Sequence, residues 1–122
     1  MAIIESPESF YSMSRRAGDM LFLSGFGPVK DGEVIGSNIE EQTIFTMDAM
    51  KDVLESEGAT WDHAMRVNVF LLNMQDRDGF NATYMNYFEK RQRMPTRRLI
   101  GAGDMYLGIL VEIDAVAYLG ET

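Results

Sequence analysis

Apolar and polar residues alternate with a period of two in several short segments of the chain, which is the pattern of half-buried β-strands. Turn-forming residues separate these segments, and Asp31-Gly32 predicts a tight hairpin because both residues tolerate a positive φ. We expect residues 25–28, Gly-Phe-Gly-Pro, to break the second strand. The predicted strands cover residues 12–17, 20–24, 33–35, 65–72, 97–100 and 110–118.

Two other segments follow the 3.6-residue period of an amphipathic helix. The first begins at Asn38, where Asn38 and Glu41 form an N-cap and capping-box pattern, and it ends near Gly58. The second covers residues 76–91 and has aromatic residues on its buried side. The order β-β-β-α-β-α-β-β predicts a single α+β domain over residues 1–122, with a mixed β-sheet and two helices packed on one face.

The last predicted strand has two different faces. One face is small and aliphatic and suits the helices, whereas the other carries Glu112 and Asp114 beside Val116 and Tyr118. Such a face can be an ordinary solvated surface. An open and partly apolar sheet face with helices behind it usually finds a partner, however, so we expect the chain to oligomerise through it.

Composition narrows the classes of function. The chain has no cysteine, one histidine and a formal net charge of −8. The absence of cysteine fits a reducing, cytoplasmic location and excludes thiol nucleophiles. With His63 alone, a metal site or a Ser-His-Asp triad has little to build on, so we expect no metal and interpret His63 as a solvated connector residue. We also expect no nucleic-acid binding, no membrane span and no signal peptide, because the chain is acidic and has no long apolar run.

Basic residues gather in one short segment. Residues 90–98 hold five of the eleven basic residues and no acidic one, which leaves six basic and nineteen acidic residues elsewhere, a net charge of −13. Residues 90–93 would lie at the C-terminus of the second helix, where the helix dipole stabilises cations. Arg97 and Arg98 lie beyond it and can pair with a carboxylate through two parallel hydrogen bonds. With Glu112 on the non-core face of the neighbouring strand to orient a water molecule, an arginine there would suffice to hydrolyse a C=N bond.

Five short motifs follow one another along the chain. They are Tyr11-Ser12, Leu-Ser-Gly-Phe-Gly-Pro at 23–28, Phe-Asn-Ala-Thr-Tyr at 80–84, Pro95-Thr96-Arg97, and Val-Glu-Ile-Asp-Ala-Val-Ala at 111–117. In this order and spacing they resemble the landmarks of the Rid (YjgF) family, and the resemblance covers essentially the whole chain. The Pro-x-Arg element together with the final strand is its specific part.

The resemblance implies a homotrimer of chorismate-mutase-like (bacillus-type) subunits, with active sites in the clefts between subunits. It implies hydrolysis of reactive enamines and imines, such as 2-iminopropanoate, to 2-oxo acids and ammonia, with a small-molecule carboxylate as substrate and no cofactor. Arg97 would hold the substrate carboxylate, and Glu112 with the backbone carbonyl of Leu99 would place the attacking water. The other substrate-binding positions are Tyr11, Ser24, Gly25, Phe26 and Asn81.

Three residues depart from the family pattern. Phe26 replaces a common Gln, Arg98 a common Ser or Thr, and Leu99 a common Cys, Ser or Thr, which favours a changed substrate. A deaminase of an aminomuconate-like dicarboxylate and a non-catalytic, ligand-binding or chaperone-like trimer remain as alternatives. If Arg97 enters the cleft, strand alternation points Arg98 away, towards the second helix or a neighbouring subunit. Phe26, at the pocket wall, would then be the main determinant of selectivity.

Overall fold

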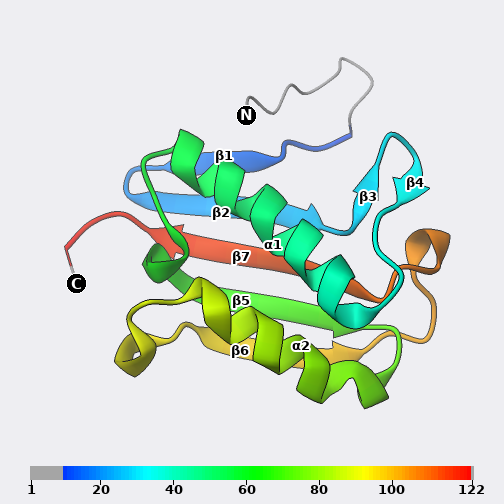
Figure 1. Ribbon diagram of the computed structural model, residues 1–122. Helices are drawn as coiled ribbons and strands as arrows, with labels where there is room; N and C mark the ends of the chain where they lie inside the picture. The colour runs from blue at the N-terminus through cyan, green and yellow to red at the C-terminus, as the bar shows by residue number, and fades with distance from the viewer. Residues whose placement is uncertain (1–9, 122) are drawn as a thin grey trace.

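The computed structural model describes residues 10–121. The strands are β1 (Ser14–Ala17), β2 (Met20–Phe26), β3 (Val29–Lys30), β4 (Glu33–Val34), β5 (Ala64–Leu71), β6 (Thr96–Gly101) and β7 (Val111–Tyr118), and the helices are α1 (Ile39–Ser56) and α2 (Arg77–Tyr84). Within this part of the chain, five strands form one sheet in the order β1-β2-β7-β5-β6, and β3 and β4 form a separate hairpin. Both helices cover the same face of the sheet (Figure 1), which confirms the predicted α+β arrangement.

The sheet is mixed because one of its four strand pairings differs from the others. β5 and β6 run parallel, whereas β1-β2, β2-β7 and β7-β5 are antiparallel. A parallel pair needs a long crossover, and α2 provides it on the helix-covered face. No helix of residues 10–121 is long and apolar enough to cross a membrane.

The turns near the start of the described chain follow the local sequence closely. Asp31 and Gly32 both have positive φ, 53° and 79°, as the hairpin prediction requires. The predicted break of the second strand comes slightly too early, because β2 continues to Phe26. Its pairing with β7 shifts register between Leu23 and Phe26, so Gly25 lies in a bulge instead of ending the strand.

The start and end of α1 also follow local chemistry. The Asn38 side chain accepts the N–H of Glu41 at 2.8 Å, which confirms the predicted N-cap. The Glu41 carboxylate binds the N–H and the hydroxyl of Ser37, at 2.8 and 2.9 Å, so the reciprocal bond is made one residue earlier than in a capping box. Gly58 follows the helix with a φ of 79°, the conformation expected of a glycine there.

The second helix is much shorter than predicted. It ends at Tyr84, and after a short 3-10 turn the backbone at Phe88 is extended. The Asp62 carboxylate accepts the N–H groups of Glu89 at 3.0 Å and Lys90 at 3.1 Å, which removes both donors from any continuing helix. The basic residues that follow therefore do not lie at the C-terminus of α2, and that interpretation of them is wrong.

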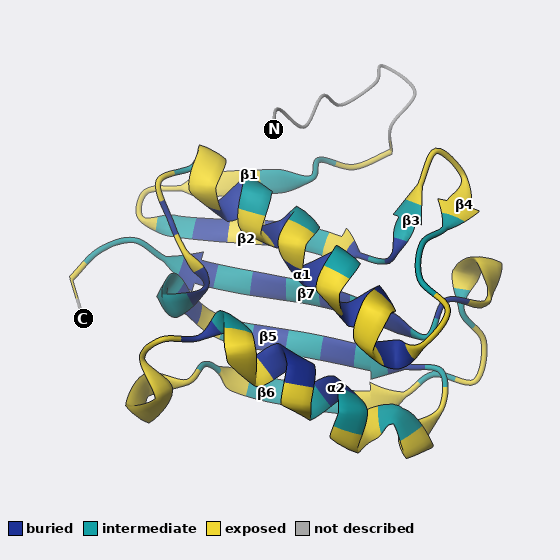
Figure 2. Ribbon diagram, in the orientation of Figure 1, coloured by how far each residue is buried: buried dark blue, intermediate teal, exposed yellow. Residues whose placement is uncertain are grey.

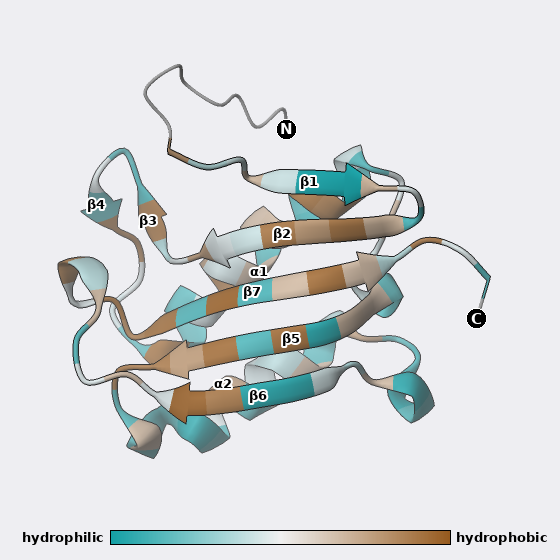
Figure 3. Ribbon diagram, turned by 180° about the vertical axis from the view of Figure 1, so that it is seen from behind, coloured by the Kyte–Doolittle hydropathy of each residue, from teal (hydrophilic) through white to brown (hydrophobic). Residues whose placement is uncertain are grey.

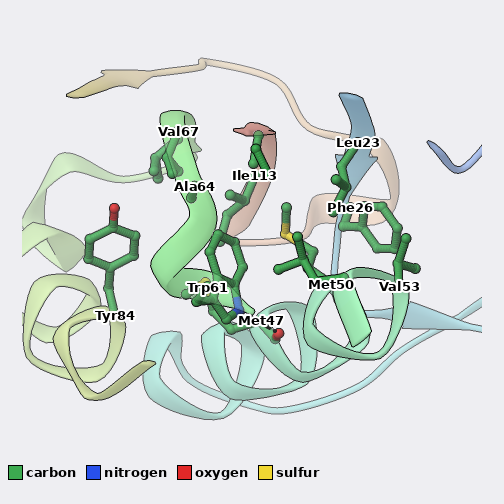
Figure 4. Packing of buried hydrophobic residues seen from close by; sticks show 14 of the residues in the cluster. Leu23, Phe26, Met47, Met50, Val53, Trp61, Ala64, Val67, Tyr84 and Ile113 are labelled. Atoms are coloured by element: carbon green, nitrogen blue, oxygen red, sulfur yellow. Dashed lines mark hydrogen bonds between the residues drawn. The ribbon is translucent and has the colours of Figure 1, made fainter. Parts of the chain in front are cut away.

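The core lies between the sheet and the two helices. Buried and partly exposed residues alternate along β7, and the buried stripe of α1 faces the sheet (Figure 2). Met47, Met50 and Val53 of α1 pack among the strand residues (Figure 4), and each such buried side chain contributes roughly 1.5–3 kcal/mol. Trp61 closes one end of the core, where its indole N–H donates to the carbonyl of Met47 at 3.2 Å.

The opposite face of the sheet carries no helix in the described chain (Figure 3). This open face, formed by the outward residues of the five strands, mixes apolar and charged side chains. Phe22 is 45% exposed and Ile100 is 43% exposed. Asp114 accepts a hydrogen bond from the Asn68 amide at 2.8 Å across β7 and β5. The face therefore combines apolar area with fixed polar groups, as expected for the outward side of the last strand.

Candidate active site

Arg97 lies on the helix-covered face of the sheet, beside α2. It is the second residue of β6 and pairs in register with Val67, a fully buried residue of β5. Its guanidinium carbon is 5.0 Å from the ring centroid of Tyr84 and 5.8 Å from that of Phe80. No carboxylate within residues 10–121 forms an ion pair with it. Arg97 is therefore a half-buried cation on two aromatic rings, without a counter-charge in the described chain.

The two rings beside Arg97 belong to a row of aromatic side chains. Phe80 and Tyr84 stack with centroids 5.3 Å apart, and Tyr84 contacts Phe88 at 4.9 Å. Burial raises the pKa of Tyr84 to about 12, and the nearby Arg97 cation opposes that rise. A guanidinium over such rings gains roughly 0.5–2 kcal/mol from their quadrupoles. The row thus holds the Arg97 cation in one place.

Arg97 and Arg98 project to opposite faces of the sheet, as strand alternation predicts. Of the two places expected for Arg98, the one near the second helix is wrong. In the structure Arg97 lies beside α2, while Arg98 is in register with Asn68, whose amide binds Asp114 on the open face. Pairing with β5 decides which arginine faces α2, because Arg97 is in register with the core residue Val67.

Asn81 and Leu99 offer different groups on the same side of the sheet. Asn81 lies on α2, and its side-chain oxygen is buried without a hydrogen-bond partner in the described chain. Leaving a buried acceptor unpaired costs about 1–3 kcal/mol, so a donor on a bound molecule would be stabilised there. The Leu99 side chain packs against the core, so its main chain is what it can present to a substrate.

Glu112 lies on the open face, where β7 meets the bulge of β2. Burial raises the pKa of its carboxyl group, and the nearby Asp114 carboxylate raises it further. A Cβ atom on Gly25 would lie 2.9 Å from the Glu112 Oε2 atom, so glycine leaves the room that this carboxylate occupies. A carboxylate with a raised pKa is a better proton acceptor for water than an ordinary glutamate.

Ser24 fixes the segment that carries Tyr11. Its hydroxyl donates to the carbonyl of Ser12 at 2.5 Å, and its N–H donates to the carbonyl of Met13 at 3.0 Å. The Ser24 hydroxyl is therefore already used in the fold, whereas Tyr11 is 63% exposed. In the described chain Ser24 therefore holds the backbone next to Tyr11, and its role in substrate binding stays a prediction.

A cavity of about 920 Å³ brings together four of the predicted site residues, Tyr11, Gly25, Phe26 and Glu112. Phe26 lines this cavity, and its side chain, 95% buried, also packs into the core near α1 (Figure 4). Tyr106 also lines this cavity. It is not predicted from the sequence, because an exposed residue in an irregular turn leaves no periodic signal.

Arg97 and Glu112 do not meet within one chain. They face opposite sides of the sheet, and β5 lies between their strands. Through Val67, Arg97 is level with Ala115, three residues from Glu112 along β7. With about 4.8 Å between strands and 3.3 Å per residue, their backbones are about 14 Å apart. The expectation that Glu112 lies on the strand next to Arg97 is wrong.

The polar groups of the site suit anion binding and proton transfer. They are a guanidinium that forms no ion pair within residues 10–121, a carboxyl group with a raised pKa and a buried amide oxygen. Among residues 10–121, no group of three or more His, Cys, Asp or Glu side chains is arranged to hold a metal ion.

The sequence matches one family over nearly its whole length. Residues 3–119 match the family model described as Endoribonuclease L-PSP. The chain belongs to this family, the Rid (YjgF) family. A RutC family protein of Saccharolobus solfataricus is 37% identical to this Rid-family chain over 109 residues, which are 88% of this chain and 85% of the relative. A RutC family protein of Pyrococcus horikoshii is 32% identical over 110 residues, 88% of this chain and 86% of the relative.

Solved structures share the fold. A Yersinia pestis protein of the conserved Rid protein family superposes with a TM-score of 0.85 and 27% identity, covering 93% of this chain and 90% of that chain. Yeast Mmf1 gives a TM-score of 0.84 and 25% identity, covering 92% and 89%. The resemblance to the Rid family predicted from the five motifs is confirmed.

Proposed function

We propose that this Rid-family protein is a hydrolytic deaminase of small enamines and imines that carry a carboxylate, in particular 2-imino acids derived from 2-aminoacrylate. The observation that carries the proposal is the half-buried Arg97 guanidinium without a carboxylate partner within residues 10–121. A buried charge without a partner is unfavourable. A substrate carboxylate bound through two parallel hydrogen bonds would offset this cost.

The proposed reaction needs only water and proton transfers. Glu112 accepts a proton from a water molecule, held also by the Leu99 carbonyl, while the water oxygen bonds to the imine carbon. The π electrons of the C=N bond move to nitrogen, which takes up a proton, and a carbinolamine results. Glu112 then carries the proton of the carbinolamine hydroxyl to the amino nitrogen. The C–N bond breaks with its electron pair going to nitrogen, so ammonia departs and a 2-oxo acid remains. No atom other than those of water is added and the overall reaction is redox-neutral, so the proposal includes no metal or organic cofactor.

We place the complete site between two copies of the chain, in a homotrimer of chorismate-mutase-like subunits. The separation of Arg97 and Glu112 on opposite faces of one sheet supports this, since a second copy can bring the two groups together. The exposed Phe22 and Ile100 support it as well, because association through the open face would remove their apolar area from water. The Rid resemblance implies the trimer.

The activity test is a panel of 2-imino acids generated enzymatically in the cuvette, with loss of the imine followed directly. We expect the protein to accelerate hydrolysis of at least one monocarboxylate imine over the spontaneous rate. Bound but unhydrolysed imines would favour the non-catalytic, ligand-binding alternative. A folded, assembled protein that neither binds nor hydrolyses any imine in the panel would refute the proposal.

A mixing experiment tests whether the site is shared. Arg97→Met and Glu112→Gln chains should each be inactive alone. If Arg97 comes from one copy and Glu112 from the next in a closed ring, unfolding and refolding an equal mixture should restore about a quarter of the wild-type activity, because that fraction of sites receives both intact residues. Each variant refolded by itself is the control. No recovery in assembled mixtures would overturn the shared site.

The dicarboxylate alternative receives no support from Arg98. Adjacent strand residues project to opposite faces, so Arg97 and Arg98 of one chain do not converge on one ligand. We further propose a cytoplasmic protein without nucleic-acid partners, since the net charge of −8 repels phosphate backbones. A Schizosaccharomyces pombe relative, 31% identical over 110 residues, is named as mitochondrial, so cell fractionation is the direct test of location.

A further inference from the structure

A second cavity, of about 580 Å³, lies at the other end of the sheet from Glu112. Two connectors form most of its wall: residues 60–63, between α1 and β5, and residues 90–95, between α2 and β6. In Figure 1 both connectors lie at the end of the sheet where β5 and β6 begin and β7 finishes. Neither Arg97 nor Glu112 lines this cavity, so the proposed deaminase site does not account for it.

The charged groups of this cavity are predominantly basic and unpaired. Lys90 and Arg93 line it, and neither forms an ion pair with any carboxylate within residues 10–121. Asp62 is the one acidic residue in the lining. One of its carboxylate oxygens accepts the N–H groups of Glu89 and Lys90, so it is committed to holding the backbone. The lining therefore holds two cations and one carboxylate, an excess of one positive charge, and no ion pair within residues 10–121 ties either cation to that carboxylate.

His63 adds a hydrogen-bond donor to the same cavity. Its Nδ1 atom accepts the N–H of Thr60 at 3.0 Å. In the neutral ring the proton must then be on Nε2, because one imidazole nitrogen donates when the other accepts. The capping of the connector thus fixes the tautomer of His63, and the Nε2–H group remains available to a ligand.

The rest of the lining mixes an apolar part with the polar side chains of Thr60, Gln92 and Thr96. Met65, Met94 and Pro95 contribute to the wall, together with Ala64 and the end of β7 at Tyr118. The volume lies within the range of about 300–1,000 Å³ that is usual for small-molecule sites. It exceeds the space needed by an inorganic anion alone, so an organic group would fill the part beyond the cations.

We propose that this cavity binds a small phosphomonoester, with its phosphate at Lys90, Arg93 and His63 and its organic part against Met65 and Met94. Lys90, Arg93 and His63 offer three donor groups for the three terminal oxygens of a phosphate, whereas a carboxylate has only two oxygens to accept them. A polyanion such as RNA fits less well, because the chain outside residues 90–98 carries a net charge of −13.

The test compares four probes by isothermal titration calorimetry with the intact wild-type protein. They are phenyl phosphate, inorganic phosphate, benzoate and a short single-stranded RNA. We expect phenyl phosphate to bind most tightly, because inorganic phosphate lacks the apolar part and benzoate lacks the third acceptor oxygen. Equal binding of benzoate and phenyl phosphate, tighter binding of the RNA, or no phenyl phosphate binding at millimolar concentrations would overturn the proposal.

Matched variants assign the binding to this cavity. The double variant Lys90→Gln/Arg93→Gln should weaken phenyl phosphate binding by about tenfold or more, because two charged donors are lost. Arg91→Gln is the control: Arg91 lies between them, does not line the cavity, and donates to the Phe88 carbonyl at 3.3 Å. An equal loss in Arg91→Gln would show a general charge effect and refute the site. If the double variant has a lowered melting temperature, the single variant Lys90→Gln decides the same question. It should weaken phenyl phosphate binding more than Arg91→Gln does.

Discussion

Replacing Arg97 by lysine separates its two contributions, the fork that binds a carboxylate and the cation that lies on aromatic rings. Lysine keeps the charge near Tyr84 and Phe80, 5.0 and 5.8 Å from the present guanidinium, so the free energy of unfolding should fall by less than about 1 kcal/mol. It loses the two-bond geometry. A hydrogen bond to a charged group contributes about 1.5–3 kcal/mol, so kcat/KM should fall by roughly ten- to a hundredfold.

The assay is steady-state hydrolysis of a monocarboxylate imine together with thermal unfolding of the same samples. The matched comparison is Arg98→Lys, the same chemical change one residue along and on the opposite face of β6. Arg97 would bind the substrate carboxylate equally in the ground state and in the transition state. Most of the loss in Arg97→Lys should therefore be a rise in KM. Unchanged kcat/KM in folded Arg97→Lys would refute the role of Arg97 in binding the carboxylate. An equal loss in Arg98→Lys would refute the assignment of the two arginines to different faces.

Three further outcomes follow from the Glu112 side of the site and from the open face. Gly25→Ala should displace the Glu112 carboxylate, 2.9 Å from the added Cβ, and lower kcat while the melting temperature barely changes, since the clash is with a flexible side chain. Because burial and then Asp114 raise the Glu112 pKa, and the ionised form accepts the proton, activity should be lost as pH falls through that raised pKa. Asp114→Asn should shift the acidic limb of the pH profile of kcat/KM to lower pH. An unshifted limb would contradict the role of Glu112 as the proton acceptor. Light scattering should give a trimer for the wild type and smaller species for Phe22→Glu. The far-UV circular dichroism of Phe22→Glu should stay native. A stable wild-type monomer would contradict the shared site.

Local features of the sequence determined most of the secondary structure. The two-residue alternation, the Asp31-Gly32 turn, the Asn38 cap and Gly58 each act within a few residues, and all four appear as predicted. The family could also be recognised from the sequence, because its motifs are short and keep their order. Four of the residues named from those motifs, among them Tyr11 and Gly25, line one cavity, whereas the other four do not.

Contacts between distant segments decided the rest. The second helix does not extend to Arg91, its predicted end, because Asp62, far along the chain, takes the N–H groups of Glu89 and Lys90 that such a helix would use. The face of Arg97 depends on its register with β5, and strand order puts β5 between Arg97 and Glu112. Periodicity shows that neighbouring strand residues point in opposite directions, but not which direction is inward when both are arginines. The partner strand decides which of the two arginines points inward. Only the tertiary structure therefore places the Arg97 cation beside α2 and the Glu112 carboxylate on the open face.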